Sequence, residues 1–216
     1  AATVVARPGE ANAAQLRNEA ARHAKGELLL FLDAGLALGA HDALERLVEQ
    51  AGQAGVAAVG GKIVDGAGRL LHTGLVLGLS ELPVSLFAGR PDNLADPVQN
   101  RYANCTRNVS AVQVALMVDT QRFLSLGGFD ETFETAGAEA ALCVRCCEAG
   151  RRVVYTPYAR FVAAISPGAR RALTRKNRDR CADVFRPMRV HGDPMLSQNP
   201  AFLRLAARAD AVEPLL

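Results

Sequence analysis

The sequence predicts an α/β fold, a mixed sheet flanked by helices, and three observations support this prediction. Short apolar runs alternate with helix-forming segments along the first half of the chain, as expected of strand and helix layers. Turn residues then separate several short strands, and such hairpins favour antiparallel neighbours. The chain of 216 residues is 50% hydrophobic and 22% charged, which is typical of a globular domain with a substantial core.

The first elements follow from composition and turn residues. Val4 and Val5 predict a short strand, and the alanine-rich residues 10–25 predict a helix that Gly26 stops. Residues 27–32 form the next strand. Their continuous apolar run is typical of a parallel strand that is covered on both faces.

A helix and a hairpin come next. Asp42 can cap the helix, and residues 56–59 form a strand beyond it. The sequence Asp-Gly-Ala-Gly at 65–68 predicts a hairpin turn between 62–64 and 70–71. The apolar residues that we expect on one face of the helix are Leu44, Leu47, Val48 and Ala51.

The second half begins with residues 80–107, which contain three prolines and few periodic apolar positions. We expect a long surface loop there, and loops of that length usually serve binding or are disordered. Residues 109–118 then predict a strand, and Asp119 starts a short helix that ends at residues 127–128. Residues 138–149 predict a further helix.

Two late strands are predicted at 153–155 and 160–165, and Asn199, followed by a proline, can cap a last helix. The sequence contains no internal repeats. We therefore place the α/β domain at residues 1–166 and an arginine-rich linker with a helical tail at 167–216.

The net charge of +3 is too small to indicate a nucleic-acid partner, and no nucleic-acid motif is present. Basic residues nevertheless gather between 160 and 189. This segment is either a solvated helix and linker or a surface that faces anionic lipid or a phosphate-bearing glycan. Its basic residues are Arg160, Arg170, Arg171, Arg175, Lys176, Arg178, Arg180, Arg186 and Arg189.

Five cysteines, an odd number, occur without a signal-peptide pattern, which favours reduced thiols and a cytoplasmic location. Cys143 and Cys146 have the spacing of a redox or zinc pair. They fall within a predicted helix, however, and no second ligand pair is present, so we interpret them as core thiols. No apolar run is long enough to span a membrane.

The most informative segment is residues 25–33, in which a buried strand opens onto Asp33 at its carboxyl end. Open α/β sheets place ligands at that end. With residues 18–21, this segment resembles the metal-site strand of family 2 glycosyltransferases. Further segments of the chain match the same family in order and spacing, and they are residues 56–61, 68–74, 108–112, 127–131, 142–145, 148–150 and 152–157.

The resemblance runs from about residue 3 to residue 166 and implies the GT-A (Rossmann-like) fold in a bacterial protein that builds polysaccharide. It implies that Asp33 and Asn18 contact a nucleotide-sugar and that Glu139 stands at the position of the catalytic base. From the residues alone, Asp33 could instead cap the next loop. The resemblance also implies an acceptor side formed by Gly127, Gly128, Phe129 and Asp130.

The polar centres of these motifs depart from the family. Gly35 replaces the second acid of the Asp-x-Asp pair, Ala141 replaces an acid beside the base, and Ala163 and Ala164 stand in a stretch that carries a histidine in the family. Val114 replaces a small residue, which narrows the space for a donor sugar.

The family usually uses Mn or Mg, and a bound cation contributes several kcal/mol to transfer. We therefore expect no metal ligands and no metal cofactor in this chain. The strand–helix–strand unit that forms the uridine half of the site is also expected to be missing.

Three hypotheses follow. The first is a catalytically degraded domain with a binding or scaffold role in glycan synthesis. The second is an active transferase, completed by an amino-terminal half or a partner chain, that uses a nucleotide-sugar and a glycan acceptor. The third is a basic module that docks on an anionic membrane surface, which would place the protein at the inner face of the inner membrane.

Overall fold

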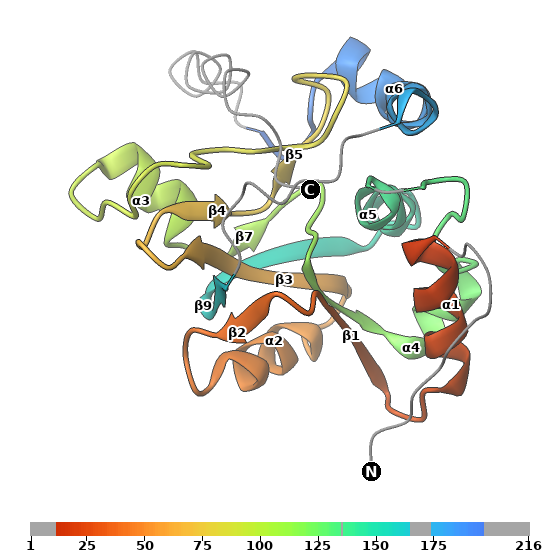
Figure 1. Ribbon diagram of the computed structural model, residues 1–216, viewed down its shortest axis with the longest axis horizontal. Coiled ribbons are helices and arrows are strands. Elements are labelled where there is room, and N and C mark those ends of the chain that lie inside the picture. Colours follow the sequence, from red (N-terminus) through yellow and green to blue (C-terminus); the bar gives the residue numbers. More distant parts are fainter. Residues whose placement is uncertain (1–11, 135, 165–173, 197–216) are drawn as a thin grey trace.

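The computed structural model describes residues 12–134, 136–164 and 174–196. Its centre is a mixed sheet with helices on both faces (Figure 1). Within the described residues, β3 and β9 are the parallel pair, and the other pairs are antiparallel. The order of the main strands is β1 (Leu28–Leu32), β8 (Ala115–Asp119), β3 (Val56–Asp65), β9 (Arg152–Ala163) and β2 (Leu36–Leu38), while β4 (Leu70–His72) pairs with β3 and β7 (Arg107–Asn108) with β9.

Alternation along β8 shows how the two faces of the sheet are covered. Leu116 and Val118 pack into the core on one face, and Ala115 and Met117 pack into the core on the other. The helices on the first face are α1 (Ala13–His23), α4 (Thr120–Ser125), α5 (Ala138–Glu148) and α6 (Arg175–His191), and the second face is covered by α2 (Ala43–Ala51).

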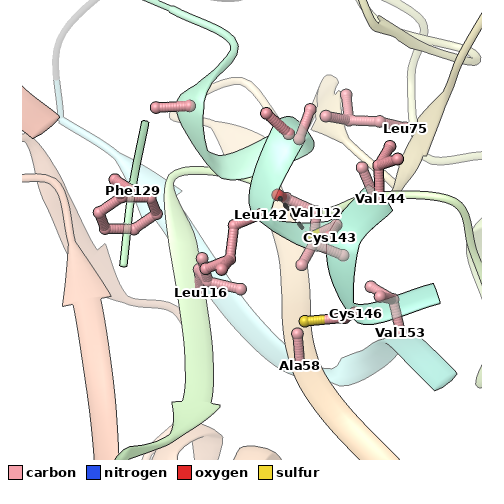
Figure 2. Close-up of a cluster of buried hydrophobic side chains, with 14 of the residues drawn as sticks. Ala58, Leu75, Val112, Leu116, Phe129, Leu142, Cys143, Val144, Cys146 and Val153 are labelled. Carbon is pink, nitrogen blue, oxygen red and sulfur yellow. Dashed lines mark hydrogen bonds between the residues drawn. The ribbon is translucent and has the colours of Figure 1, made fainter. Parts of the chain in front are cut away.

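Helix α5 forms the centre of the larger core. Leu142, Cys143 and Cys146 are fully buried against the sheet (Figure 2). All five cysteines are free, and burial raises the pKa of Cys146 to about 11. The interpretation of Cys143 and Cys146 as core thiols is confirmed.

Local signals set the ends of the helices. α1 begins with a capping box in which the Asn12 side chain accepts from the Gln15 backbone N–H and the Gln15 side chain accepts in return. It ends at His23 rather than at Gly26, since Ala24 is already extended. Asp119 caps α4 as expected. Asp42 precedes α2 but pairs with Arg46 instead of capping.

The predicted apolar face of α2 is wrong in part. Leu47 and Ala43 are buried, whereas Leu44 and Val48 are 39% and 47% exposed. The buried stripe of this helix is narrower than the pattern predicted, because residues 44 and 48 lie on the edge of the stripe.

The predicted surface loop at 80–107 is also wrong. The segment contains β6 (Val84–Ser85), which pairs with β5 (Leu75–Val76), and α3 (Pro97–Ala103). It forms a third core with Leu70 of β4. The buried residues that it supplies to this third core are Val84, Leu86, Phe87, Tyr102 and Ala103, whereas Leu82 belongs to the larger core.

Strand predictions hold with three corrections. The hairpin at 65–68 joins β3 and β4 as predicted. β1 pairs antiparallel with β8 and has no second neighbour among the described residues, so its apolar run does not mark a central parallel strand. The strand predicted at 109–118 is regular only from Ala115, and the two late strands are one bulged strand, β9.

Several predictions lie outside the described residues. These are the strand at Val4 and Val5, the helix at Asn199, and the arginines at 170 and 171. The predicted domain boundary at 166 falls there too. Beyond it, Cys181 and Phe185 of α6 are buried in the same core as α5, so α6 packs on the sheet domain.

Candidate functional site

The site is built where β1 ends. The Asp33 backbone N–H donates to the carbonyl of Val114 (3.1 Å), and the Leu36 N–H donates to the carbonyl of Asp33 (3.0 Å). This turn sends the chain into β2, which pairs with the end of β9. Asp33 is therefore held by its backbone at the carboxyl end of the strand, as the sequence predicted.

The same turn brings together two positions at which the sequence lacks expected metal ligands. Leu36 lies opposite Ala163 in the ladder, and the Ala164 N–H donates to the Gly35 carbonyl (2.8 Å). Gly35 and Ala163 are far apart in sequence, yet both belong to one end of the β2–β9 pair. Neither residue has a side-chain donor atom, so this corner offers a cation only backbone oxygens from these two positions.

Arg17 joins Asp33 to Glu139. Its Nη2 donates to Asp33 Oδ1 (2.7 Å), and its Nη1 donates to Glu139 Oε1. The three residues come from α1, the end of β1 and the first turn of α5. The Glu139 side chain is 13% exposed and that of Asp33 is 48% exposed, so the pair with Glu139 is the better shielded from water. We call Arg17, Asp33 and Glu139 the Arg17 cluster.

The electrostatics of the Arg17 cluster are coupled. Burial, together with Glu139, raises the pKa of Asp33 above its usual value, although Arg17 acts in the opposite direction. Burial tends to lower the pKa of Arg17, but the two carboxylates outweigh it and raise that pKa. Arg17 is thus a permanent cation between two acids, and with all three groups ionised the cluster carries a net charge of −1.

The predicted acceptor-side residues form a tight turn after α4. Gly127 and Gly128 both have positive φ, and a Cβ on Gly128 would lie 2.6 Å from Asn18 Oδ1. Phe129 is buried between Phe31 and Phe123. Position 128 therefore requires glycine, both for its positive φ and because a Cβ there would clash with Asn18.

Asn18 is the link between this turn and α1. Its Nδ2 donates to the Phe129 carbonyl (2.9 Å) and to Glu131 Oε1 (2.9 Å), and its Oδ1 accepts from the Phe129 N–H (2.8 Å). The Asn18 side-chain amide is buried, and both its nitrogen and its oxygen form hydrogen bonds within the chain. In this arrangement Asn18 positions the turn at residues 127–130 next to Arg17.

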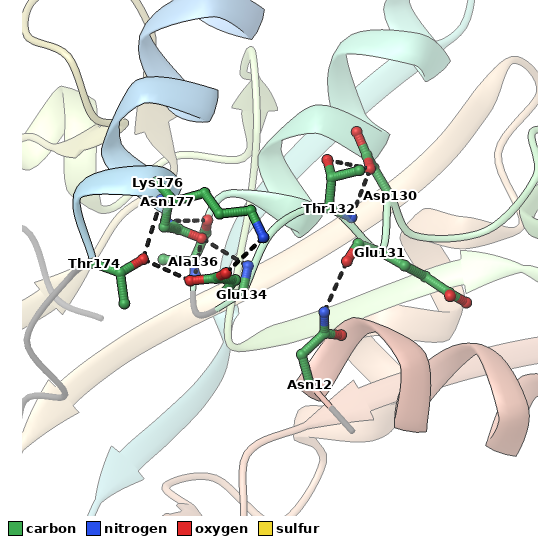
Figure 3. A network of polar contacts seen from close by, with 9 residues as sticks. All are labelled: Asn12, Asp130, Glu131, Thr132, Glu134, Ala136, Thr174, Lys176 and Asn177. Carbon is green, nitrogen blue, oxygen red and sulfur yellow. Dashed lines mark hydrogen bonds and ion pairs between the residues drawn. The ribbon is translucent and has the colours of Figure 1, made fainter. Parts of the chain in front are cut away.

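Asp130 faces the other way, toward α6. Its carboxylate accepts from Arg180 (2.6 Å) and from the Thr132 hydroxyl (2.6 Å). The turn that follows is bound on both sides, by Asn12 of the α1 cap and by the start of α6 (Figure 3). Residues 128–134 and 136–137, which lead into Glu139, are therefore clamped between α1 and α6.

Val114 is strained beside the site. Its φ of 71° lies in the left-handed region, which a β-branched residue rarely adopts. Its carbonyl accepts the Asp33 N–H. The strained peptide thus helps to fix the strand end that carries Asp33.

Sequence reasoning missed Arg17 and the contribution of α6. Arg17 stands one residue before a predicted site residue, but nothing in the sequence indicates which way a single arginine on an alanine-rich helix points. The described residues contain no group of three or more His, Cys, Asp or Glu that could hold a metal ion. With two carboxylates already bridged by a guanidinium, the cluster does not fit a divalent metal.

The chain is similar to two longer proteins. It is 34% identical over 150 residues to the O-antigen biosynthesis protein RfbC of Myxococcus xanthus, covering 68% of this chain and 12% of RfbC. It is 32% identical over 154 residues to the uncharacterized protein y4gI of Sinorhizobium fredii, covering 68% of this chain and 16% of y4gI. The chain therefore spans about an eighth to a sixth of the length of these relatives. No protein-family model matches it.

The fold is similar to that of GalNAc-T7, solved with UDP, GalNAc and Mn2+. The TM-score is 0.59 at 15% identity, over 94% of this chain and 42% of GalNAc-T7. A likeness at that identity concerns the fold, and it confirms the GT-A-like architecture. Among the described residues, no helix combines the length and apolarity needed to cross a membrane.

Proposed function

We propose that the chain, which has a GT-A-like fold, is a family 2-like glycosyltransferase domain that is catalytically degraded and has a binding or scaffold role in glycan synthesis. The observation that carries this proposal is the Arg17 cluster. Asp33 and Glu139, the acids that remain at the Asp-x-Asp position and at the base position, are both held by one guanidinium.

The chemistry of transfer explains why this arrangement opposes turnover. A general base must accept the proton of the acceptor hydroxyl, and Glu139 is instead engaged with Arg17 in a mostly buried ion pair. The leaving diphosphate needs a cation, and neither Gly35 nor Ala163 supplies a side-chain ligand to hold one. Each 1.4 kcal/mol of lost stabilisation slows transfer about tenfold, so the two losses together suppress it by several orders of magnitude.

The relatives suggest the chemical class of ligand. RfbC is named for O-antigen biosynthesis, and GalNAc-T7 was solved with UDP and a sugar. We propose that any ligand of this domain is a nucleotide-sugar or a glycan acceptor. In this proposal the turn at 127–130, which Asn18 holds from behind, keeps its shape on the acceptor side, because its packing does not depend on a metal.

Release of nucleoside diphosphate from UDP-sugars tests the proposal. The purified chain is incubated with a panel of UDP-sugars and glycan acceptors, beside Glu139→Gln and a matched control, Glu49→Gln, on the exposed face of α2. We expect all three proteins to give the same background release. Turnover by the unmodified chain that falls at least a hundredfold in Glu139→Gln, but not in the control, would overturn the proposal.

A second candidate function is an active transferase that another part of a larger protein completes. It is favoured by the small share of RfbC and y4gI that the chain spans, 12% and 16%. Here Asp33 contacts the diphosphate or the metal that accompanies it, and Glu139 is the base, after Arg17 has moved away from Glu139. The same Glu139→Gln substitution, made in a longer protein that contains this domain, should then abolish turnover.

A further inference from the structure

We infer that Arg17, the cation that bridges Asp33 and Glu139, keeps a divalent metal out of this site. This inference deepens the proposed function, since it concerns the same site. It also makes a separate claim about the metal affinity of the chain, which can be measured without any turnover.

The geometry places the guanidinium between the two acids. Both of its terminal nitrogens are used, one on each carboxylate. Its carbon also lies 6.0 Å from the centre of the Phe129 ring, which is itself buried and fixed by Phe31 and Phe123. Arg17 is therefore held by two ion pairs and by aromatic packing.

A metal ion at this place would meet two obstacles. The guanidinium fills the space between the carboxylates, and its fixed positive charge repels another cation at short range. Mn2+ and Mg2+ also favour several oxygen ligands, whereas the described residues offer two carboxylates here. Both obstacles must be removed before the site can hold a metal with useful affinity.

It follows that Gly35→Asp alone does not restore a metal site. That substitution adds a third carboxylate at the end of the β2–β9 pair but leaves Arg17 in place. Arg17→Gln alone removes the cation but leaves only two acids. We expect affinity for Mn2+ to appear in the double variant, Arg17→Gln with Gly35→Asp.

The test is a calorimetric titration with MnCl2 of four proteins: the unmodified chain, each single variant and the double variant. Arg22→Gln serves as the matched control, because Arg22 lies on the same helix and pairs with Glu19, an acid outside the Arg17 cluster. We expect the double variant to bind Mn2+ at least tenfold more tightly than the other proteins. Adding Asp33→Asn to the double variant should remove the gain.

Two results would overturn the inference. One is binding of Mn2+ by Gly35→Asp alone as tight as by the double variant, since Arg17 would then be no obstacle. The other is a double variant that is folded by thermal melting and still fails to bind. Arg17→Lys combined with Gly35→Asp is a second check, because it keeps a cation at this position and should also exclude Mn2+.

The two claims can fail independently. Tight Mn2+ binding by Gly35→Asp would refute the exclusion of metal by Arg17 without restoring a base. Turnover that depends on Glu139 would refute the proposed loss of catalysis, whatever the four titrations show.

Discussion

Val114 has a left-handed backbone conformation, which β-branched residues rarely adopt. Its carbonyl accepts the hydrogen bond from the Asp33 N–H. Such a conformation costs on the order of 1–3 kcal/mol. Replacing Val114 with glycine removes that cost, while the lost packing of a half-buried side chain and the greater freedom of the unfolded chain act against it. The opposing effects should nearly cancel.

We therefore expect Val114→Gly to change the free energy of unfolding by less than about 1 kcal/mol. Val118→Gly, at a fully buried position of strand β8, which begins one residue after Val114, should cost about 3 kcal/mol or more. Urea unfolding of both variants measures the difference. Equal destabilisation by the two substitutions would mean that the strain at Val114 has no energetic weight.

His72 of β4 gives the chain a predicted sensitivity to acid. It is buried, and neither ring nitrogen has a hydrogen-bond partner among the described residues. Burial, helped by the nearby Arg107, lowers the pKa of His72 to about 3. Between that value and about 6.5, the unfolded chain binds a proton on this residue and the folded chain does not. The free energy of unfolding is therefore unaffected by His72 above about pH 6.5, and it decreases as the pH falls from there toward 3.

Between pH 7 and pH 5, this residue should account for a loss of about 2 kcal/mol in the free energy of unfolding. His72→Leu removes the titrating group, so the variant should lose that much less over the same interval. His41→Leu, at an exposed position, should behave like the unmodified chain. Denaturant unfolding at both pH values is the measurement, and identical losses in all three proteins would contradict the assignment.

At the scale of elements, α6 is a structural part of the site and not an independent basic tail. Asn177 is fully buried, and its side chain accepts from the Glu134 N–H (2.9 Å) and donates to the Ala136 carbonyl (3.0 Å). A Cβ on Gly137 would lie 2.8 Å from Cys181 Sγ, so the helix approaches the segment before Glu139 closely. At the other end of α6, Asp193 accepts from the Leu77 N–H (2.6 Å).

Asn177→Ala leaves two backbone groups of the clamped segment without this partner, and we expect it to cost about 2–3 kcal/mol. Arg175→Ala, on the exposed side of the same helix, should cost less than about 0.5 kcal/mol. Thermal or urea unfolding compares the two variants. A neutral Asn177→Ala would show that α6 does not clamp residues 128–134 and 136–137.

The elements differ in how well the sequence predicted them. α4, α5 and the β3–β4 hairpin carry local signals, such as Asp119 as a cap and glycine at 66 and 68, and these were placed correctly. The segment 80–107 has no such periodicity, and its residues are buried by contacts with distant parts of the chain. Its apolar residues, among them Val84 and Phe87, show no periodic pattern in the sequence. They come together only where the fold packs them against β4.

On the scale of the whole molecule, the family resemblance identified which positions form the candidate site, but not which contacts their side chains make. It placed Asp33 and Glu139 in matching motifs, and the structure brings them together through Arg17. That bridge could not be predicted, because the direction of Arg17 depends on how α1 packs against α5 and Phe129. The convergence of Gly35 with Ala163 likewise depends on strand pairing that no local pattern reveals.

Because Arg17 holds both acids, we expect binding of a nucleotide-sugar at this site to be independent of a divalent metal. Calorimetric titration of the unmodified chain with UDP and UDP-sugars, with and without Mn2+, tests this claim most directly. We expect the binding heats, whether zero or measurable, to be the same in both conditions. Nucleotide-sugar binding that appears only when Mn2+ is present would contradict the claim.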